Sequence, residues 1–188
     1  GTGKTAAFGI PAIEKIVDPE DQADPQVLVL CPTRELAMQV SDELRKFSKY
    51  KEGLRVVTVY GGQNIDTQIR ALKRAAVVVG TPGRVIDHIR RRTLKLMNIK
   101  LAILDEADEM LDMGFVDDIK QILFNTPENR QTALFSATMP PPIMRLTQRF
   151  LRNPETVKGD EGDTAFNLIQ QYYVEVPKSK KAQGVRLL

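Results

Sequence analysis

Short apolar runs alternate with longer amphipathic segments along this 188-residue chain. The apolar runs are rich in Val, Ile and Leu, which is typical of strands buried on both faces of a parallel sheet. We predict strands at 26–31, 54–60, 75–80, 100–104 and 132–136, and helices at 4–17, 33–49, 65–74, 83–91, 116–124 and 140–150. This alternation indicates an α/β fold whose sheet is covered by helices on both faces.

The helix expected at 33–49 has the clearest periodicity. Leu36, Val40, Leu44 and Phe47 recur at the spacing of one helical face, and charged residues occupy most of the remaining positions. Thr33 and Asp66 are the residue types that cap helix N-termini, so we predict that they begin the helices near 33 and 65.

Polar or glycine-rich segments follow the predicted strands. They are residues 32–35, 61–62, 81–84, 105–108 and 136–138. In open α/β sheets, ligands bind beyond the carboxyl ends of the strands. We therefore expect these segments to share one edge of the sheet, beside the loop at residues 1–5.

Residues 1–5 read GTGKT and precede a predicted helix, as at the end of a phosphate-binding loop. In such a loop the backbone N–H groups surround phosphate oxygens, Lys4 would contact the β- and γ-phosphates, and the Thr5 hydroxyl would ligate Mg²⁺. An incidental glycine turn before a helix is the alternative interpretation.

Two adjacent carboxylates, Asp105 and Glu106, follow a buried apolar strand. Asp105 suits a magnesium site in which most ligands are water, and Glu106 suits activation of an attacking water. Asp108 would contact Ser136 or Thr138 from the neighbouring strand end. For Asp108, an acidic helix start that complements the helix dipole is an alternative interpretation.

A polymer partner is suggested by Arg34, Arg84 and the glycines at 61–62. Glycines allow a nucleic-acid backbone to approach, and arginine adds a charge-assisted phosphate contact. Taken singly, these residues are also typical of ordinary turns and loops. We expect the basic run at 90–92 to be a solvated helix end, His88 to be structural or exposed, and Cys31 to be a buried thiol.

Composition narrows the class of protein only slightly. The net charge of +3 and the pI near 9.0 are compatible with nucleic acid. One cysteine and one histidine exclude an internal disulfide and the usual zinc ligand sets. Because no apolar run reaches about 18 residues and no signal peptide is recognisable, we expect no membrane partner and a cytoplasmic protein.

The two ends of the chain suggest pieces of larger units. A phosphate loop usually follows an apolar strand, so we expect a vacant strand position beside residues 1–5. We predict a nucleotide-binding domain at 1–158, a linker at 159–167, and the opening fragment of a second domain at 168–188.

Taken in order, the segments 1–5, 32–37, 61–62, 81–84, 105–108 and 136–138 resemble the motif series of the first RecA-like domain of DEAD-box RNA helicases. The resemblance covers essentially residues 1–157 and implies a RecA-like sheet that lacks the strand before the phosphate loop. It also implies ATP and Mg²⁺ as cofactors and RNA as a partner, with little sequence preference. The fragment at 168–188 looks like the start of a second RecA-like domain.

The resemblance also implies roles for individual residues. Catalytic roles fall to Lys4, Asp105 and Glu106, and nucleotide contacts to these three with Gly1, Thr2, Gly3 and Thr5. Metal binding, largely through water, falls to Thr5 and Asp105. RNA contacts fall to Thr33, Arg34, Gly61, Gly62, Thr81, Gly83 and Arg84. Coupling of the nucleotide state to RNA falls to Asp108, Ser136 and Thr138.

The implied activity is ATP-dependent unwinding of short duplexes or remodelling of RNA–protein complexes, in company with protein cofactors. The family's glutamine motif and second-domain arginines are not recognisable here, so we expect almost no ATP turnover from these residues alone. A DNA helicase or translocase with the same core is one alternative. An RNA-clamping scaffold that binds ATP without unwinding is another.

Overall fold

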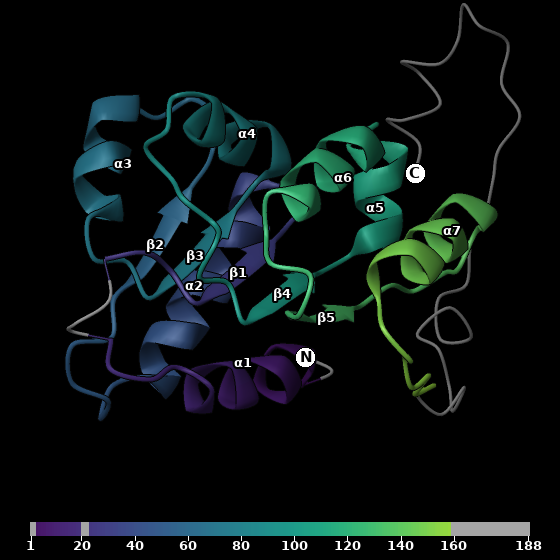
Figure 1. Ribbon diagram of the computed structural model, residues 1–188, viewed down its shortest axis with the longest axis horizontal. Coiled ribbons are helices and arrows are strands. Elements are labelled where there is room, and N and C mark those ends of the chain that lie inside the picture. The colour runs from purple at the N-terminus through teal and green to yellow at the C-terminus, as the bar shows by residue number, and fades with distance from the viewer. Residues whose placement is uncertain (1–2, 20–22, 159–188) are drawn as a thin grey trace, which may run out of the picture. The chain divides into compact units, whose positions relative to one another are not determined.

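The computed structural model describes residues 3–19 and 23–158 (Figure 1). The predicted linker at 159–167, the predicted fragment at 168–188 and the site residues Gly1 and Thr2 lie outside the described residues. The chain divides into the units Gly1–Pro154 and Glu155–Leu188. Of the second unit, residues 155–158 are described, and they are exposed and form no helix or strand.

Five parallel strands form one sheet in the order β2-β3-β1-β4-β5. The strands are β1 (Val27–Leu30), β2 (Val56–Val59), β3 (Val77–Gly80), β4 (Leu101–Leu104) and β5 (Gln131–Leu134). The helices are α1 (Lys4–Glu14), α2 (Arg34–Phe47), α3 (Ile65–Leu72), α4 (Pro82–Arg90), α5 (Ala107–Asp112), α6 (Val116–Phe124) and α7 (Pro141–Phe150). The predicted α/β alternation is confirmed.

Hydrophobic side chains alternate between the two faces of the sheet, and each face has its own core. Leu28 and Leu30 of β1 pack in a cluster with buried residues of α3 to α7. Val27 and Val29 pack in a second cluster with buried residues of α1 and α2. Helices therefore cover both faces, as the uninterrupted apolar strands predicted.

The last residues of the five strands lie in one row across the sheet. Leu30 is in register with both Gly80 and Leu104, Val59 with Gly80, and Leu104 with Leu134. The segments after all five strands therefore start at the same edge, as the sequence predicted.

Helix starts differ in part from prediction. Thr33 is the N-cap of α2, as predicted, and its Oγ1 accepts a hydrogen bond from Leu36 N–H (3.2 Å). The prediction for Asp66 was wrong, because Asn64 is the N-cap of α3 and its Oδ1 accepts from Asp66 N–H (2.8 Å). Asn64 stands at the point where the chain still has a non-helical conformation, which an N-cap requires.

β5 is a terminal strand of the sheet, and it is more exposed than the other four. Gln131 is exposed and the next three residues are half-buried, whereas β1, β3 and β4 are buried throughout. The predicted further strand position beside the phosphate loop stays a prediction. Within residues 3–19 and 23–158, no helix has the length and apolar content needed to cross a bilayer.

Candidate functional site

The start of α1 presents backbone amides at the shared sheet edge. Gly3 is the N-cap with a left-handed φ of 71°, a conformation that glycine adopts at no steric cost. Ala7 N–H donates to Gly3 O (3.0 Å) and closes the first turn. The N–H groups of Lys4, Thr5 and Ala6 therefore have no partner within the helix, which makes this helix start suitable for an anion.

Asp105 directly follows β4 and is buried, with 4% of its surface exposed. Among the described residues, its Oδ1 is one of three buried side-chain polar atoms without a hydrogen-bond partner. Burial raises the pKa of this carboxyl group, the Lys4 ammonium opposes the rise, and Glu106 adds to it. An unpartnered buried carboxylate oxygen is costly and is well suited to a cation.

We expect Asp105→Asn to raise the free energy of unfolding by about 1 kcal/mol at neutral pH without nucleotide. The folded-state pKa is raised, so wild type loses stability as pH rises from about 3.9 through that pKa, and the amide variant does not. Urea unfolding across this range checks the prediction. A variant that is less stable at neutral pH, or a difference that persists in acid, would contradict it.

Glu106 has an unusual backbone conformation for its residue type. It is the N-cap of α5, with φ 53° and ψ 55°, in the left-handed region. Such strain at a residue other than glycine is concentrated at functional sites. This conformation turns the chain between the end of β4 and the start of α5. Asp105 and Glu106 therefore both lie at the tip of the strand.

Asp108 joins the end of β4 to the end of β5 through hydrogen bonds. Its backbone N–H donates to Ser136 Oγ (3.1 Å), and its Oδ2 accepts from both the backbone N–H and the Oγ1 hydroxyl of Thr138 (2.9 Å each). The predicted contact is confirmed. Burial raises the pKa of Asp108, but the hydrogen bonds outweigh burial and leave the pKa below its ordinary value of 3.8.

We expect Thr138→Val to lower the free energy of unfolding by about 0.5–1 kcal/mol at neutral pH, because one hydrogen bond to a carboxylate is lost. A lowered folded-state pKa contributes stability above about pH 4 that disappears as pH falls through the folded value. The difference between wild type and variant should therefore shrink in acid. Urea unfolding from neutral to acidic pH measures it, and a difference independent of pH would contradict the assignment.

A second part of the site is a shallow groove beyond the ends of β2 and β3. Its volume is about 440 Å³, and its lining is Gly61, Thr81, Gly83, Arg84, Ile86, Asp87, Arg90 and Phe115. The structure thus brings Gly61 together with Thr81, Gly83 and Arg84, which belong to a second sequence segment. Arg90 and Phe115 were not predicted as part of this groove.

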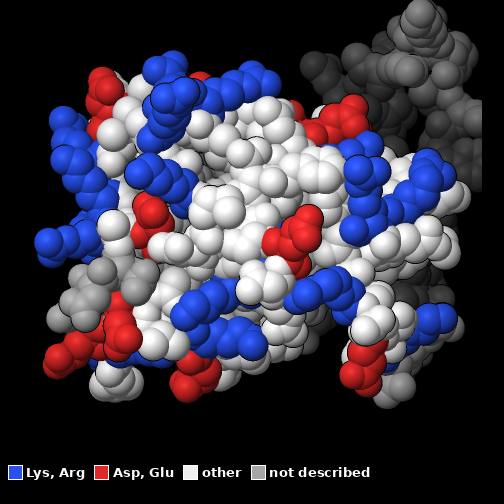
Figure 2. All heavy atoms as spheres, in the orientation of Figure 1, with Lys and Arg blue, Asp and Glu red and all other residues white. Residues whose placement is uncertain are grey.

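Arg34 lies close to the same segment. Its guanidinium lies 4.8 Å from the centre of the Tyr60 ring. Tyr60 is the residue before Gly61. Figure 2 shows Lys and Arg side chains gathered over α3 and α4. Both Arg34 and Gly62 are exposed, as contact with a large partner requires.

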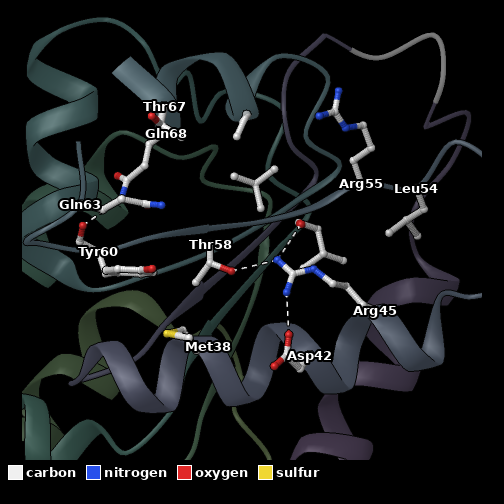
Figure 3. A pocket seen from close by; sticks show the side chains of 13 residues that line it. Met38, Asp42, Arg45, Leu54, Arg55, Thr58, Tyr60, Gln63, Thr67 and Gln68 are labelled. Carbon is white, nitrogen blue, oxygen red and sulfur yellow. Dashed lines mark hydrogen bonds and ion pairs between the residues drawn. The ribbon is translucent and has the colours of Figure 1, made fainter. Parts of the chain in front are cut away.

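A larger groove of about 540 Å³ lies beside the terminal strand β2, between α2 and α3 (Figure 3). Its main cation is already engaged, since Arg45 donates to Asp42 Oδ1 (2.7 Å), Val56 O (3.2 Å) and Thr58 Oγ1 (3.1 Å). None of the residues predicted to hold nucleotide lines this groove. Size alone therefore does not identify the nucleotide site.

Two residues to which the sequence assigned no chemistry lie close to the site. Cys31 is buried, as predicted, and burial raises the pKa of its thiol well above 9.0, with the charges of Asp105 and Glu106 adding to the rise. His88 is completely buried in α4. The sequence left open whether His88 is structural or exposed, and the structure excludes exposure.

The chain belongs to the DEAD/DEAH box helicase family, whose model matches residues 1–146. It is 56% identical over 182 residues to the DEAD-box ATP-dependent RNA helicase CshA of Bacillus licheniformis. It is 57% identical over 182 residues to CshA of Geobacillus kaustophilus. Each alignment covers 96% of this chain, and the chain spans 37% and 38% of these relatives.

Solved structures show the same fold. A DEAD box protein from Methanococcus jannaschii has a TM-score of 0.78 at 44% identity, over 98% of this chain and 49% of that one. The yeast DEAD-box splicing factor Prp28 has a TM-score of 0.74 at 34% identity, over 81% of this chain and 38% of that one. The predicted RecA-like α/β fold and the predicted family are confirmed.

Proposed function

We propose that this chain is the ATP-binding part of an RNA helicase. The observation that carries the proposal is the single row of strand ends, Val59, Gly80, Leu30, Leu104 and Leu134. This row places the start of the carboxylate segment, the Asp108–Thr138 hydrogen bonds and the glycine-lined groove at one edge. Nucleotide and polymer would then share that edge.

The phosphates of ATP fit the start of α1. In this proposal the phosphates accept hydrogen bonds from the loop at 1–5, and Lys4 neutralises the β- and γ-phosphates. The exposed Lys4 is close enough to Asp105 to affect its pKa. Lys4, which would bind phosphate, and Asp105, which would bind the metal, therefore lie close to one another.

The residues present fit Mg²⁺. The buried Asp105 Oδ1 has no partner among the described residues, and Thr5 stands in the first turn of α1. The described residues contain no cluster of three or more His, Cys, Asp or Glu side chains that could hold a metal ion. A magnesium ion held by few protein atoms, water and phosphate oxygens meets that description. When bound, Mg²⁺ would neutralise charge on the phosphates.

In the proposed reaction, Glu106 orients a water molecule and accepts its proton, as a positioned carboxylate can. The left-handed backbone conformation supports this role, because Glu106 precedes the first residue of α5 and directly follows Asp105 at the strand tip. Asp108, Ser136 and Thr138 would transmit the nucleotide state, since their hydrogen bonds tie the segment after Glu106 to the end of β5.

RNA would bind by its backbone along the groove that contains Gly61, Thr81, Gly83 and Arg84, with Gly62, Thr33 and Arg34 beside it. No atom would lie within 4 Å of a Cβ added at Gly61 or Gly83, so a phosphate could approach these glycines closely. Backbone contacts of this kind position the strand and carry little sequence information.

The activity of the whole protein is part of the proposal, since this chain spans little more than a third of its curated relatives. These relatives are named as ATP-dependent RNA helicases. We further propose that 1–158 is the first RecA-like domain, 159–167 the linker and 168–188 the opening of a second such domain. Protein cofactors and a cytoplasmic location, where ATP and RNA meet, complete the proposal.

Phosphate release by the full-length protein tests this function. We expect strong stimulation by single-stranded RNA and little by single-stranded DNA of the same length and sequence. Equal stimulation by DNA would favour a DNA helicase or translocase. ATP-dependent RNA binding without phosphate release or duplex separation would favour an RNA-clamping scaffold.

A further inference from the structure

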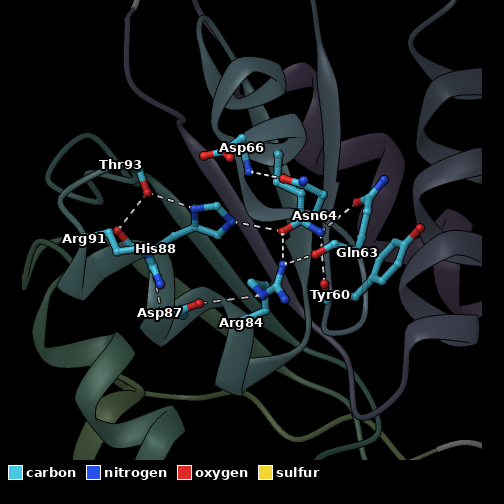
Figure 4. A network of polar contacts seen from close by, with 10 residues as sticks. Tyr60, Gln63, Asn64, Asp66, Arg84, Asp87, His88, Arg91 and Thr93 are labelled. Atoms are coloured by element: carbon cyan, nitrogen blue, oxygen red, sulfur yellow. Dashed lines mark hydrogen bonds and ion pairs between the residues drawn. The ribbon is translucent and has the colours of Figure 1, made fainter.

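A buried polar network lies behind the glycine-lined groove and joins α3 to α4 (Figure 4). Its centre is Gln68 of α3, which is 1% exposed, and His88 of α4, which is 0% exposed. Gln68 Oε1 lies 3.0 Å from His88 Nε2. Since burying polar side chains without partners is costly, their full set of contacts decides whether the network is stable.

The hydrogen bonds fix the orientation of the Gln68 amide. Its Nε2 donates to Tyr60 O (2.9 Å) and to Gln63 Oε1 (2.7 Å). Its Oε1 accepts from Arg84 Nη1 (3.1 Å), because a guanidinium can only donate. Both protons and both acceptor positions of the amide are therefore in use, counting the contact with His88.

The same reasoning fixes the proton on His88. Because Gln68 Oε1 is an acceptor, His88 Nε2 must carry the hydrogen. Burial lowers the pKa of His88, and the charges of Arg84 and Arg91 add to this effect against that of Asp87. The neutral ring then offers Nδ1 as an acceptor to Thr93 Oγ1 (2.8 Å), whose single hydroxyl proton is shared with His88 O (3.2 Å). His88 thus contacts the side-chain oxygen of Gln68 through Nε2, and Thr93 contacts His88 at Nδ1.

The network forms hydrogen bonds with the residues on both sides of the Gly61–Gly62 turn, Tyr60 and Gln63. Tyr60 O and the Gln63 side chain bind Gln68, and Gln63 O accepts from Arg84 Nη1 (3.0 Å). Between them, Gly61 and Gly62 are exposed and would have no atom within 4 Å of an added Cβ. The described side-chain hydrogen bonds at the two ends of this turn therefore come from the buried Gln68 and the half-buried Arg84.

Arg84 links the network to the lining of the groove, to which both Arg84 and Asp87 of α4 belong. Its Nη1 donates to Gln63 O and to Gln68 Oε1. Its Nε lies 3.9 Å from Asp87 Oδ2, and its side chain is only 14% exposed. The guanidinium is thus held in one orientation instead of sampling solvent. Ordering such a side chain before a ligand arrives removes an entropic cost from binding.

We propose that Gln68 and His88 are positioning residues for RNA binding, which hold the Gly61–Gly62 turn and Arg84 ready for the RNA backbone. This inference rests on the proposed function, because it assumes that RNA occupies the groove. Neither residue need touch RNA, since both are buried and neither lines the groove that contains Gly61 and Arg84. Gln68 lies instead at the wall of the larger groove between α2 and α3.

The test uses the full-length protein with Gln68→Met, which preserves volume and removes all four polar contacts. We expect the RNA concentration for half-maximal ATPase stimulation to rise about tenfold, because the turn must then be ordered on binding. The KM for ATP should stay within about twofold, since nucleotide binds elsewhere. Hydrogen exchange of the Gly61–Gln63 amides should quicken while that of β3 does not.

Thr126→Val is the matched control. Thr126 is also buried and loses one hydrogen bond, to Leu123 O (2.6 Å), but it stands between α6 and β5. It should lower thermal stability without changing half-saturation by RNA. If Gln68→Met does not fold, Thr93→Val replaces it, with an expected rise of about two- to threefold through His88 alone.

The outcomes separate this inference from the proposed function. No RNA stimulation of wild type would overturn the proposed function. Stimulation of wild type with unchanged half-saturation in the folded Gln68 or Thr93 variant would overturn the inference alone. Equal changes in the Thr126 control would also overturn it, because the effect would then be one of general stability.

Discussion

Replacing Glu106 by glutamine in the full-length protein is expected to lower RNA-stimulated ATP hydrolysis about 10²–10⁴-fold, the usual contribution of a positioned general base. ATP affinity should change little, because Lys4, the helix start and Asp105 remain. The amide has almost the same shape, so the strained turn at φ 53° is retained. Single-turnover hydrolysis and equilibrium nucleotide binding measure the two quantities separately.

Glu109→Gln is the matched control for charge. Glu109 lies in the first turn of α5 and is exposed, and it should leave hydrolysis within about twofold of wild type. The assignment of Glu106 would be wrong if its variant kept most of the wild-type rate, or if both variants lost activity to the same degree.

Gly80→Ala is expected to destabilise the fold by about 1–3 kcal/mol or more, the largest effect on stability that we predict. An added Cβ would lie 2.6 Å from Val59 Cγ2, 2.7 Å from Val85 Cγ2 and 2.9 Å from the backbone oxygen of Val59. The backbone oxygen belongs to the sheet and cannot move aside. Gly80 also ends β3 in the row of strand ends.

Thermal unfolding measures this effect, at about 2–4 °C per kcal/mol for a domain of this size. Gly83→Ala is the control, because no atom lies within 4 Å of its added Cβ and stability should stay within about 0.5 kcal/mol. Equal melting temperatures for Gly80→Ala and wild type would show that the strand end tolerates a side chain.

The sheet could be predicted because its strands are apolar throughout and each is followed by turn residues. Parallel pairing then places the carboxyl ends of neighbouring strands at one edge, and in the structure Leu30 is in register with Gly80 and Leu104. Helix α5 was not among the predicted helices, although an acidic helix start was one interpretation of Asp108. It is only six residues long and begins after Glu106 in the left-handed region, and neither periodicity nor residue type indicates that conformation in a glutamate.

The candidate site likewise contains residues that the sequence could indicate and residues that it could not. Asp105, Glu106 and the loop at 1–5 could be proposed as site residues from spacing, since each follows a strand or precedes a helix. The contact between Gln68 and His88 could not be found, because it joins residues 20 positions apart on two helices. A glutamine and a histidine on helices have no local signal that distinguishes burial from exposure. Phe115 entered the groove through tertiary packing in the same manner.

Because one sheet edge is proposed to hold both nucleotide and RNA, we expect bound nucleotide to change the affinity for RNA. The Glu106→Gln full-length protein would be titrated into labelled single-stranded RNA with ATP and Mg²⁺, with ADP and Mg²⁺, and without nucleotide. We expect binding about 5–150-fold tighter with ATP than without nucleotide, the usual range for coupled sites. Equal affinity under all three conditions would contradict it.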